Sequence, residues 1–221
     1  MITEGHSGPE EFRLLFVCTA NICRSPMAAE LTRLRLRAAA LSAEEDIRVS
    51  SAGTHGHEGA DMDPEAAAVL RSLGGRTMGF SARTVTVPLL ATADLVLTAE
   101  RRHRAAAAAL YPRSHARLFT ILEFARLARQ IDPGRLSGEG VVSRARSLVR
   151  EAARMRGTCP PGPSDEDIAD PYQGPAEGYR ACATVIEKAL DLPLRRILSE
   201  PPGPRGNVGH FSTTRHSAAD S

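Results

Sequence analysis

Large aromatic side chains are scarce in this sequence. It contains no tryptophan, and aromatic residues make up only 4% of its 221 residues. Hydrophobic residues nevertheless reach 42%, against 24% charged residues. We therefore expect a folded core built mainly from alanine, valine, leucine and isoleucine. The length predicts one domain with additional segments rather than two complete domains.

Long hydrophobic runs are also lacking. No apolar run approaches the ~20 residues that a membrane helix needs. The first eleven residues are polar and acidic, whereas a secretory signal has a basic start followed by an apolar stretch. We therefore expect a cytoplasmic protein without membrane insertion.

Charge of one sign does not dominate the chain. Its 28 basic and 26 acidic residues leave a formal net charge of +2, which is too small to indicate a nucleic-acid partner. Lys188 is the only lysine, so almost all the basic residues are arginines, spread along the chain with alanine and proline. This composition is typical of a GC-rich genome, with a basic binding surface as the alternative.

Cysteines are few and do not form a recognisable framework. Secreted disulfide scaffolds are shorter and richer in cysteine, and zinc sites use pairs spaced as C-x2-C, which are absent here. His55 and His57 lack partner ligands and are interpreted as loop residues. We expect no metal and no cofactor. The four cysteines are Cys18, Cys23, Cys159 and Cys182.

Short apolar runs alternate with helical patterns through most of the chain. This alternation predicts an α/β fold, a four-stranded parallel sheet with helices on both faces. The predicted strands are 13–17, 47–51, 94–98 and 116–120. One predicted helix starts near Pro26 and has an apolar face formed by Met27, Leu31, Leu34, Ala38 and Leu41. The other predicted helices are 64–73, 100–110, 121–130, 141–156 and 175–191.

Composition also suggests the domain limits. We expect one domain over 12–198, with an insertion or long lid at about 131–165. The proline-rich and polar segment 199–221 is expected to be a disordered tail, as is the polar segment 1–11.

The segment CTANICRS, residues 18–25, joins the first predicted strand to the first predicted helix. Ser25 is a suitable N-cap and Pro26 a suitable first helical residue. Ligands of open α/β sheets bind at the carboxyl ends of strands, where this loop lies. Its backbone N–H groups can curl around an anion beside a helix N-terminus. The predicted phosphate-binding residues are Thr19, Ala20, Asn21, Ile22, Cys23, Arg24 and Ser25.

Two side chains give this loop its chemistry. Arg24 can hold two phosphate oxygens with its planar fork. The same positive field favours the thiolate of Cys18, which would face the bound phosphate as an in-line nucleophile. Asn21 tolerates the left-handed backbone that a tight loop demands, and Ser25 can donate a hydrogen bond to the thiolate. The alternative makes Cys18 a small buried residue and Arg24 a surface cap.

The segment VCTANICRSP, residues 17–26, resembles the signature of the low-molecular-weight protein tyrosine phosphatases. Further matches are SAGT at 51–54, the DP at 63–64, AR at 82–83, DLVLTAE at 94–100 and DPY at 170–172. The resemblance covers roughly 12–128 and 165–192. The short segment between Ser51 and Asp63, which lacks an aromatic residue, is similar to the bacterial branch that dephosphorylates tyrosine kinases.

The resemblance implies roles for individual residues. Cys18 is the implied nucleophile, Arg24 the phosphate ligand and Asp170 the general acid, with Tyr172 beside the substrate ring. The implied partner is a phosphotyrosine protein such as a bacterial tyrosine kinase. Cys23 lies five residues after Cys18 in one curled loop, so the two sulfurs could form a disulfide, and the resemblance implies this protective redox role.

The sequence departs from the family pattern at two positions. Phe80 stands where many members have a histidine that braces the loop, so we expect Asn21 to brace it with Ser25 and Ser51. His57 occupies a rim position where relatives often have an apolar or aromatic residue, which leaves the substrate preference open.

Other acids and other functions remain as alternatives. Among three Asp-Pro pairs, Asp63 is interpreted as an N-cap and Asp132 lies in the insertion. Asp165 and Asp167 are rivals of Asp170. An arsenate reductase of this fold would use further cysteines downstream, and a phosphoarginine phosphatase would carry threonine in place of Ile22. A non-catalytic phosphotyrosine-binding module is the alternative from another class.

Overall fold

A computed structural model describes residues 11–39, 41–159 and 166–198. Four parallel strands form one sheet in the order β2–β1–β3–β4, as predicted. The third strand begins one residue later than predicted, and the last strand begins later because a 3-10 turn, η1 (Pro112–Arg117), precedes it. The strands are β1 (Phe12–Cys18), β2 (Ile47–Gly53), β3 (Leu95–Thr98) and β4 (Leu118–Thr120).

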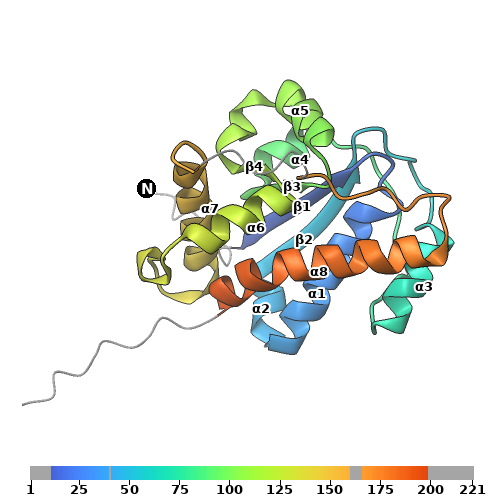
Figure 1. Cartoon of the computed structure of the whole chain (residues 1–221), viewed down its shortest axis with the longest axis horizontal. Helices are drawn as coiled ribbons and strands as arrows, with labels where there is room; N and C mark the ends of the chain where they lie inside the picture. The colour runs from blue at the N-terminus through green and yellow to red at the C-terminus, as the bar shows by residue number, and fades with distance from the viewer. Residues whose placement is uncertain (1–10, 40, 160–165, 199–221) are drawn as a thin grey trace, which may run out of the picture.

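Helices cover both faces of the sheet (Figure 1). Leu14 and Phe16 of β1 face the larger core cluster, and Leu15 and Val17 face the smaller one. Burying each such side chain contributes about 1.5–3 kcal/mol. The larger cluster packs α1 (Arg24–Ala39), α3 (Pro64–Ser72), α6 (Ile121–Gln130) and α8 (Ala176–Leu198), while the smaller packs α4 (Val87–Thr92) and α5 (Arg101–Leu110). The short α2 (Leu41–Asp46) lies between α1 and β2 in the chain.

Several details of the predicted helices are wrong. Leu41 begins the separate helix α2, and α8 runs to Leu198, beyond the predicted end at 191. The helix α1 begins at Arg24, so Ser25 is not its N-cap. The hydroxyl of Ser25 contacts Cys18 and Asn21 instead. Further along α1, Leu36 is fully buried while Ala38 is exposed, because the buried face turns toward α8.

The start of α3 follows its sequence signal. The Asp63 carboxylate accepts hydrogen bonds from the N–H groups of Glu65 and Ala66 at 3.0 and 3.1 Å. The helix ends before Gly74, which has a φ of +83°. Asp63 is thus an N-cap, as predicted, and its carboxylate is engaged there.

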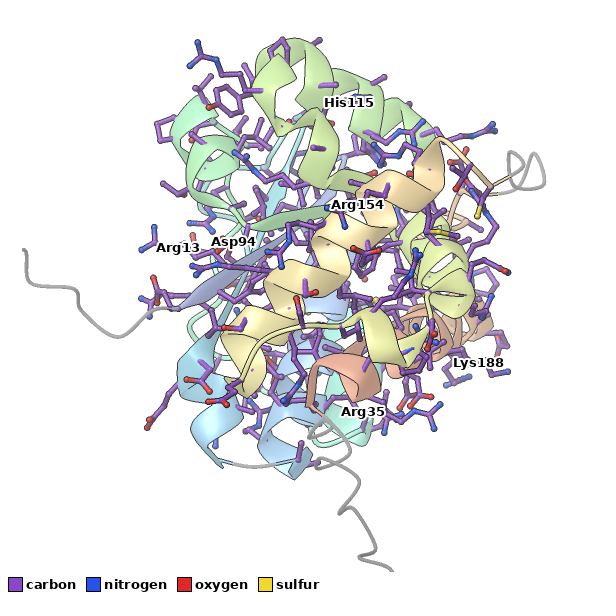
Figure 2. All side chains as sticks on the ribbon, turned by 90° about the vertical axis from the view of Figure 1, so that its left-hand side faces the viewer. Arg13, Arg35, Asp94, His115, Arg154 and Lys188 are labelled. Carbon is purple, nitrogen blue, oxygen red and sulfur yellow. The ribbon has the colours of Figure 1, made fainter. Side chains whose placement is uncertain are left out.

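The segment predicted as an insertion contains η2 (Pro133–Arg135) and α7 (Gly140–Arg156). Arg146 of α7 contacts Asp94, just before β3, and Arg156 donates to the carbonyl oxygen of Leu118 at the start of β4. In Figure 2, α7 crosses the front of the molecule, and Asp94 is labelled to its left, beside Arg13. Therefore α7 lies at the amino ends of the strands, opposite the loop after β1.

The long-lid interpretation is therefore wrong for α7. A buried stripe that includes Ala145, Leu148 and Ala152 holds this helix against α6 and α8. Residues 160–165, and the predicted tails apart from Glu11, lie outside the described residues. No described helix has both the length and the apolar character needed to cross a membrane.

Candidate functional site

The loop between β1 and α1 turns its carbonyl oxygens outward. Those of Thr19, Ala20 and Ile22 accept hydrogen bonds of 2.9–3.0 Å from N–H groups in the segment 55–63. The backbone N–H groups of residues 19–23, in contrast, donate to no protein acceptor within the described chain. Because buried N–H groups are rarely left unpaired, this run of free donors predicts a bound anion.

Asn21 holds the loop in this shape. It is fully buried and has a φ of +60°, in the left-handed region. Its Nδ2 donates to the hydroxyls of Ser25 and Ser51, both at 2.9 Å, and its Oδ1 accepts from the N–H of Arg83 at 3.0 Å. The predicted bracing by Asn21, Ser25 and Ser51 is confirmed, and Phe80 packs against the core instead of contributing a polar group.

Cys18 ends β1 and its sulfur lies 3.0 Å from the Ser25 hydroxyl oxygen. The same hydroxyl accepts from Asn21 and lies 3.2 Å from the carbonyl oxygen of Ala52. A Cys18 thiol can donate to Ser25 while Ser25 donates to Ala52. When Cys18 is a thiolate, the single Ser25 proton can turn to the sulfur. The contact therefore serves both protonation states.

Arg24 is buried below the loop, with only 1% of its surface exposed. Its Nη1 donates to Glu100 and to the carbonyl oxygen of Ile168, at 3.0 Å for the latter. Its Nη2 donates to Asp170 at 2.6 Å. Its buried Nε has no partner among the residues that the structure describes. The guanidinium is thus fixed by two carboxylates and retains a free donor.

Glu100 is a further site residue, and no role for it was predicted from the sequence. Burial acts to raise its pKa, but hydrogen bonds from Arg102 and Arg24 hold that pKa below its usual value. It is therefore an anion that orients Arg24. Its position just after β3 could have indicated this role, because β3 pairs in parallel with β1 and the two strands end side by side.

His103 is the second missed residue. Arginines flank it in the sequence, a pattern typical of a solvated helix face, but its side chain is only 2% exposed. Its Nε2 lies 2.8 Å from the Thr19 hydroxyl, and its buried Nδ1 has no partner within the described part of the chain. Burial lowers the pKa of His103 to about 4, against the opposing effect of Glu100. A neutral imidazole thus ties α5 to the loop.

A cavity of about 200 Å³ opens above the loop. It brings together most of the predicted site residues, including the proposed rim residues His57 and Tyr172. Asn21 and Ser25 do not line it and brace the loop from behind. Its lining is Cys18, Thr19, Ala20, Ile22, Cys23, Arg24, His57, Asp170 and Tyr172.

The rival acids are not equivalent to Asp170. Asp167 accepts from the backbone N–H of Arg101 at 2.6 Å and does not line the cavity. Asp165 lies outside the described residues. Asp170 is the carboxylate that both lines the cavity and reaches Arg24.

The other cysteines are ordinary buried or half-buried thiols. Burial, with a contribution from Asp63, raises the pKa of Cys23, and burial raises that of Cys182 to about 12. All four cysteines are free, and the redox role of Cys23 stays a prediction. In the part of the chain that the structure describes, no three histidine, cysteine or acidic side chains cluster as a metal site would require.

Comparison with known proteins points to one family. The family model of low molecular weight phosphotyrosine protein phosphatases matches residues 13–154. A low molecular weight protein-tyrosine-phosphatase of Streptomyces coelicolor is 32% identical over 195 residues, covering 87% of this chain and 97% of the relative. The low molecular weight protein-tyrosine phosphatase A of Mycobacterium tuberculosis is 32% identical over 182 residues, covering 82% and 88%. The solved structure of an arginine phosphatase from Geobacillus stearothermophilus superposes with a TM-score of 0.60 at 26% identity, covering 84% of this chain and 92% of that one.

Proposed function

We propose, from the premise that this chain belongs to the low molecular weight phosphotyrosine protein phosphatase family, that it hydrolyses phosphotyrosine in proteins through a cysteinyl-phosphate intermediate. The observation that carries the proposal is the loop of free N–H donors with Cys18 at its start and buried Arg24 at its end. Such a loop binds a phosphoryl group and presents a sulfur to it.

In the first step the Cys18 thiolate attacks phosphorus and the bond to the tyrosine oxygen breaks. The loop N–H groups and Arg24 stabilise the equatorial oxygens, which carry most of the charge. The phenolate has a pKa near 10, so it needs a proton as it leaves. Asp170 lines the cavity. Once the phosphate has displaced it from Arg24, Asp170 takes a proton from solvent and passes it to the leaving oxygen.

In the second step water attacks the phosphocysteine and the sulfur–phosphorus bond breaks. Asp170, now a carboxylate, accepts a proton from the water. The Ser25 hydroxyl, 3.0 Å from the sulfur, donates to the departing thiolate. Free phosphate and the starting thiolate result.

The cavity lining favours an aryl phosphate. Ile22 offers an apolar side chain and Tyr172 an aromatic ring beside Cys18, which suits a phenyl group. The structural similarity to an arginine phosphatase makes phosphoarginine the second candidate substrate. Arsenate reduction is less favoured, because the sequence has no cysteine between Cys23 and Cys159.

Turnover by the purified protein tests this proposal. Phosphotyrosine peptides should be hydrolysed faster than phosphoarginine peptides. The Cys18→Ser variant should still bind vanadate but lose turnover, because a serine hydroxyl is protonated at neutral pH. Retention of more than about a tenth of the parent rate would contradict the mechanism, and binding of phosphotyrosine without turnover by the parent protein would indicate a binding module.

The Asp170→Asn variant tests the general acid. Loss of the acid should slow phosphotyrosine by about 10²–10⁴-fold. An activated nitrophenyl phosphate should be slowed much less, because its leaving group needs no proton. Equal losses on both substrates would remove this role from Asp170.

We also propose a phosphotyrosine protein, such as a bacterial tyrosine kinase, as the partner, and the cytoplasm as the location. The four free cysteines, which include the catalytic Cys18, suit a reducing compartment. Cell fractionation with an antibody to the chain tests the location, and recovery in a secreted fraction would contradict it.

A further inference from the structure

Five arginines line an open pocket of about 600 Å³ beside β2, the edge strand of the sheet. The pocket lies between α1, β2 and the segment 76–83, and it shares no lining residue with the cavity above Cys18. We call it the arginine groove. Its arginines are Arg33, Arg37, Arg48, Arg76 and Arg83.

Glu30 is the one carboxylate among the residues that line the groove. Glu30 is 4% exposed and accepts from Arg33 at 3.3 Å, from Arg37 at 2.8 Å and from the backbone N–H of Arg76 at 2.8 Å. Its two oxygens are therefore fully engaged. Since each guanidinium carries five N–H donors, the groove retains a large excess of positive donors.

Three arginines supply most of this excess. The side chains of Arg48 and Arg76 are exposed and have no acceptor among the residues that the structure describes. Arg83 donates from Nε to the carbonyl oxygen of Ser51 at 2.9 Å, its charge also interacts with the nearby Glu58 carboxylate, and its Nη groups face the pocket's ligand only in competition with Glu58. These groups are spaced around one pocket rather than scattered over the surface.

The edge of β2 cannot add a further strand here. Its carbonyl oxygens at Val49 and Ser51 already accept from Arg33 at 2.7 Å and from Arg83. A partner must therefore be recognised by its side chains rather than by backbone pairing. The lining also contains Met78, which is 97% exposed, and the half-buried Phe80, so it has an apolar side.

The positive surface continues across the edge strand, toward the start of β1 and α4. A second pocket of about 480 Å³ shares Arg48, Ser50 and Arg83 with the groove and adds Arg13, which pairs with Glu11. Together the two pockets form one basic surface that crosses the edge of β2 between α1 and α4, which gives room for a segment of chain rather than one small ion.

We propose that the arginine groove binds an acidic, extended segment of a partner protein. Its carboxylates would pair with Arg48, Arg76 and Arg83, and an apolar side chain would rest on Met78 and Phe80. A single-stranded nucleic acid suits the groove less well, because stacking needs several aromatic faces and Phe80 is the only aromatic residue in the lining. The arginine-rich composition allowed a basic binding surface as an alternative, and this proposal places that surface at the arginine groove.

Fluorescence anisotropy with a labelled peptide of glutamates around a central leucine tests the proposal on the full chain. The Arg48→Ala/Arg76→Ala variant should weaken binding at least about tenfold, as loss of two complementary charges allows. An Arg113→Ala/Arg150→Ala variant loses the same charge from η1 and α7 and should bind within about twofold of the parent. Binding should weaken with salt, because the screening length falls from about 10 Å at 0.1 M to about 3 Å at 1 M.

Two further measurements separate this site from the catalytic one. Orthovanadate, which occupies the Cys18 loop, should leave peptide binding unchanged, and neither double variant should change turnover of nitrophenyl phosphate. Displacement of the peptide by orthovanadate, or an equal loss in the control variant, would overturn the proposal. An oligonucleotide that binds more tightly than the peptide would also overturn it. Because the peptide carries no phosphate, its binding and the effect of the two double variants on that binding do not depend on the proposed phosphatase activity.

Discussion

Replacement of Asn21 tests how the phosphate-binding loop is held. Its side chain makes three hydrogen bonds, to Ser25, Ser51 and the N–H of Arg83. Each is worth about 0.5–1.5 kcal/mol, so their loss should cost about 3 kcal/mol of unfolding free energy. Both Asn21→Gly and Asn21→Ala lose all three bonds.

The two variants differ in the backbone. A φ of +60° costs alanine about 1–2 kcal/mol, whereas glycine adopts it freely. Glycine gives back part of this difference through its greater freedom in the unfolded chain. Asn21→Ala should therefore be less stable than Asn21→Gly by about 0.5–1 kcal/mol, the reverse of the order at ordinary positions.

Urea denaturation followed by far-ultraviolet circular dichroism measures both values, since the chain has no tryptophan to report by fluorescence. Ser51→Ala, which removes one of the bonds, should cost about 1 kcal/mol. Both Asn21 variants should also lose about 10²-fold in kcat/KM, because a loop displaced by about 1 Å no longer fits the phosphoryl group. Parent-like stability of either variant, or a more stable Asn21→Ala, would refute this reasoning.

Three further predictions follow from single residues. A Cβ at Gly53 would lie 2.3 Å from the carbonyl oxygen of Thr19, so Gly53→Ala should displace the loop and lower kcat/KM; unchanged kinetics would contradict the packing. Burial lowers the pKa of His103 from 6.5 to about 4, so its contribution to stability is complete above pH 6.5 and lost as the pH falls toward 4. Between pH 6.5 and pH 4, the free energy of unfolding should fall by up to about 3 kcal/mol less in His103→Gln than in the parent, as measured by urea denaturation. An unchanged pH profile would exclude this role. Peroxide should inactivate the enzyme reversibly through a Cys18–Cys23 disulfide, whereas Cys23→Ala should not recover in dithiothreitol; full recovery of that variant would sink the redox role.

Much of this fold is visible in short stretches of sequence. Runs such as 13–17 are apolar on both sides, as a strand covered on two faces must be, and Asp63 before a proline specifies a helix start within four residues. The loop at 18–25 is also local, so its side chains could be assigned together. The sequence predicts Ser25 as an N-cap, but its hydroxyl forms hydrogen bonds with Cys18 and Asn21 instead of capping the helix.

The features that the sequence did not predict depend on contacts between distant residues. The position of α7 is set by Arg146 at Asp94 and by packing against α8, neither of which leaves a local pattern. His103 sits in a run of arginines and is buried only because the end of β3 lies beside β1. The arginine groove likewise combines α1, β2 and the segment 76–83, which are far apart in sequence.

Trapping the phosphorylated enzyme tests the central claim most directly. Acid quenching during turnover of a phosphotyrosine peptide, followed by peptide mass mapping, should find phosphate on Cys18 and on no other residue. The trapped fraction should rise in Ser25→Ala, because the departing thiolate then lacks its hydrogen-bond donor 3.0 Å away. Turnover with Cys18 unmodified, or phosphate carried by another residue, would contradict the account.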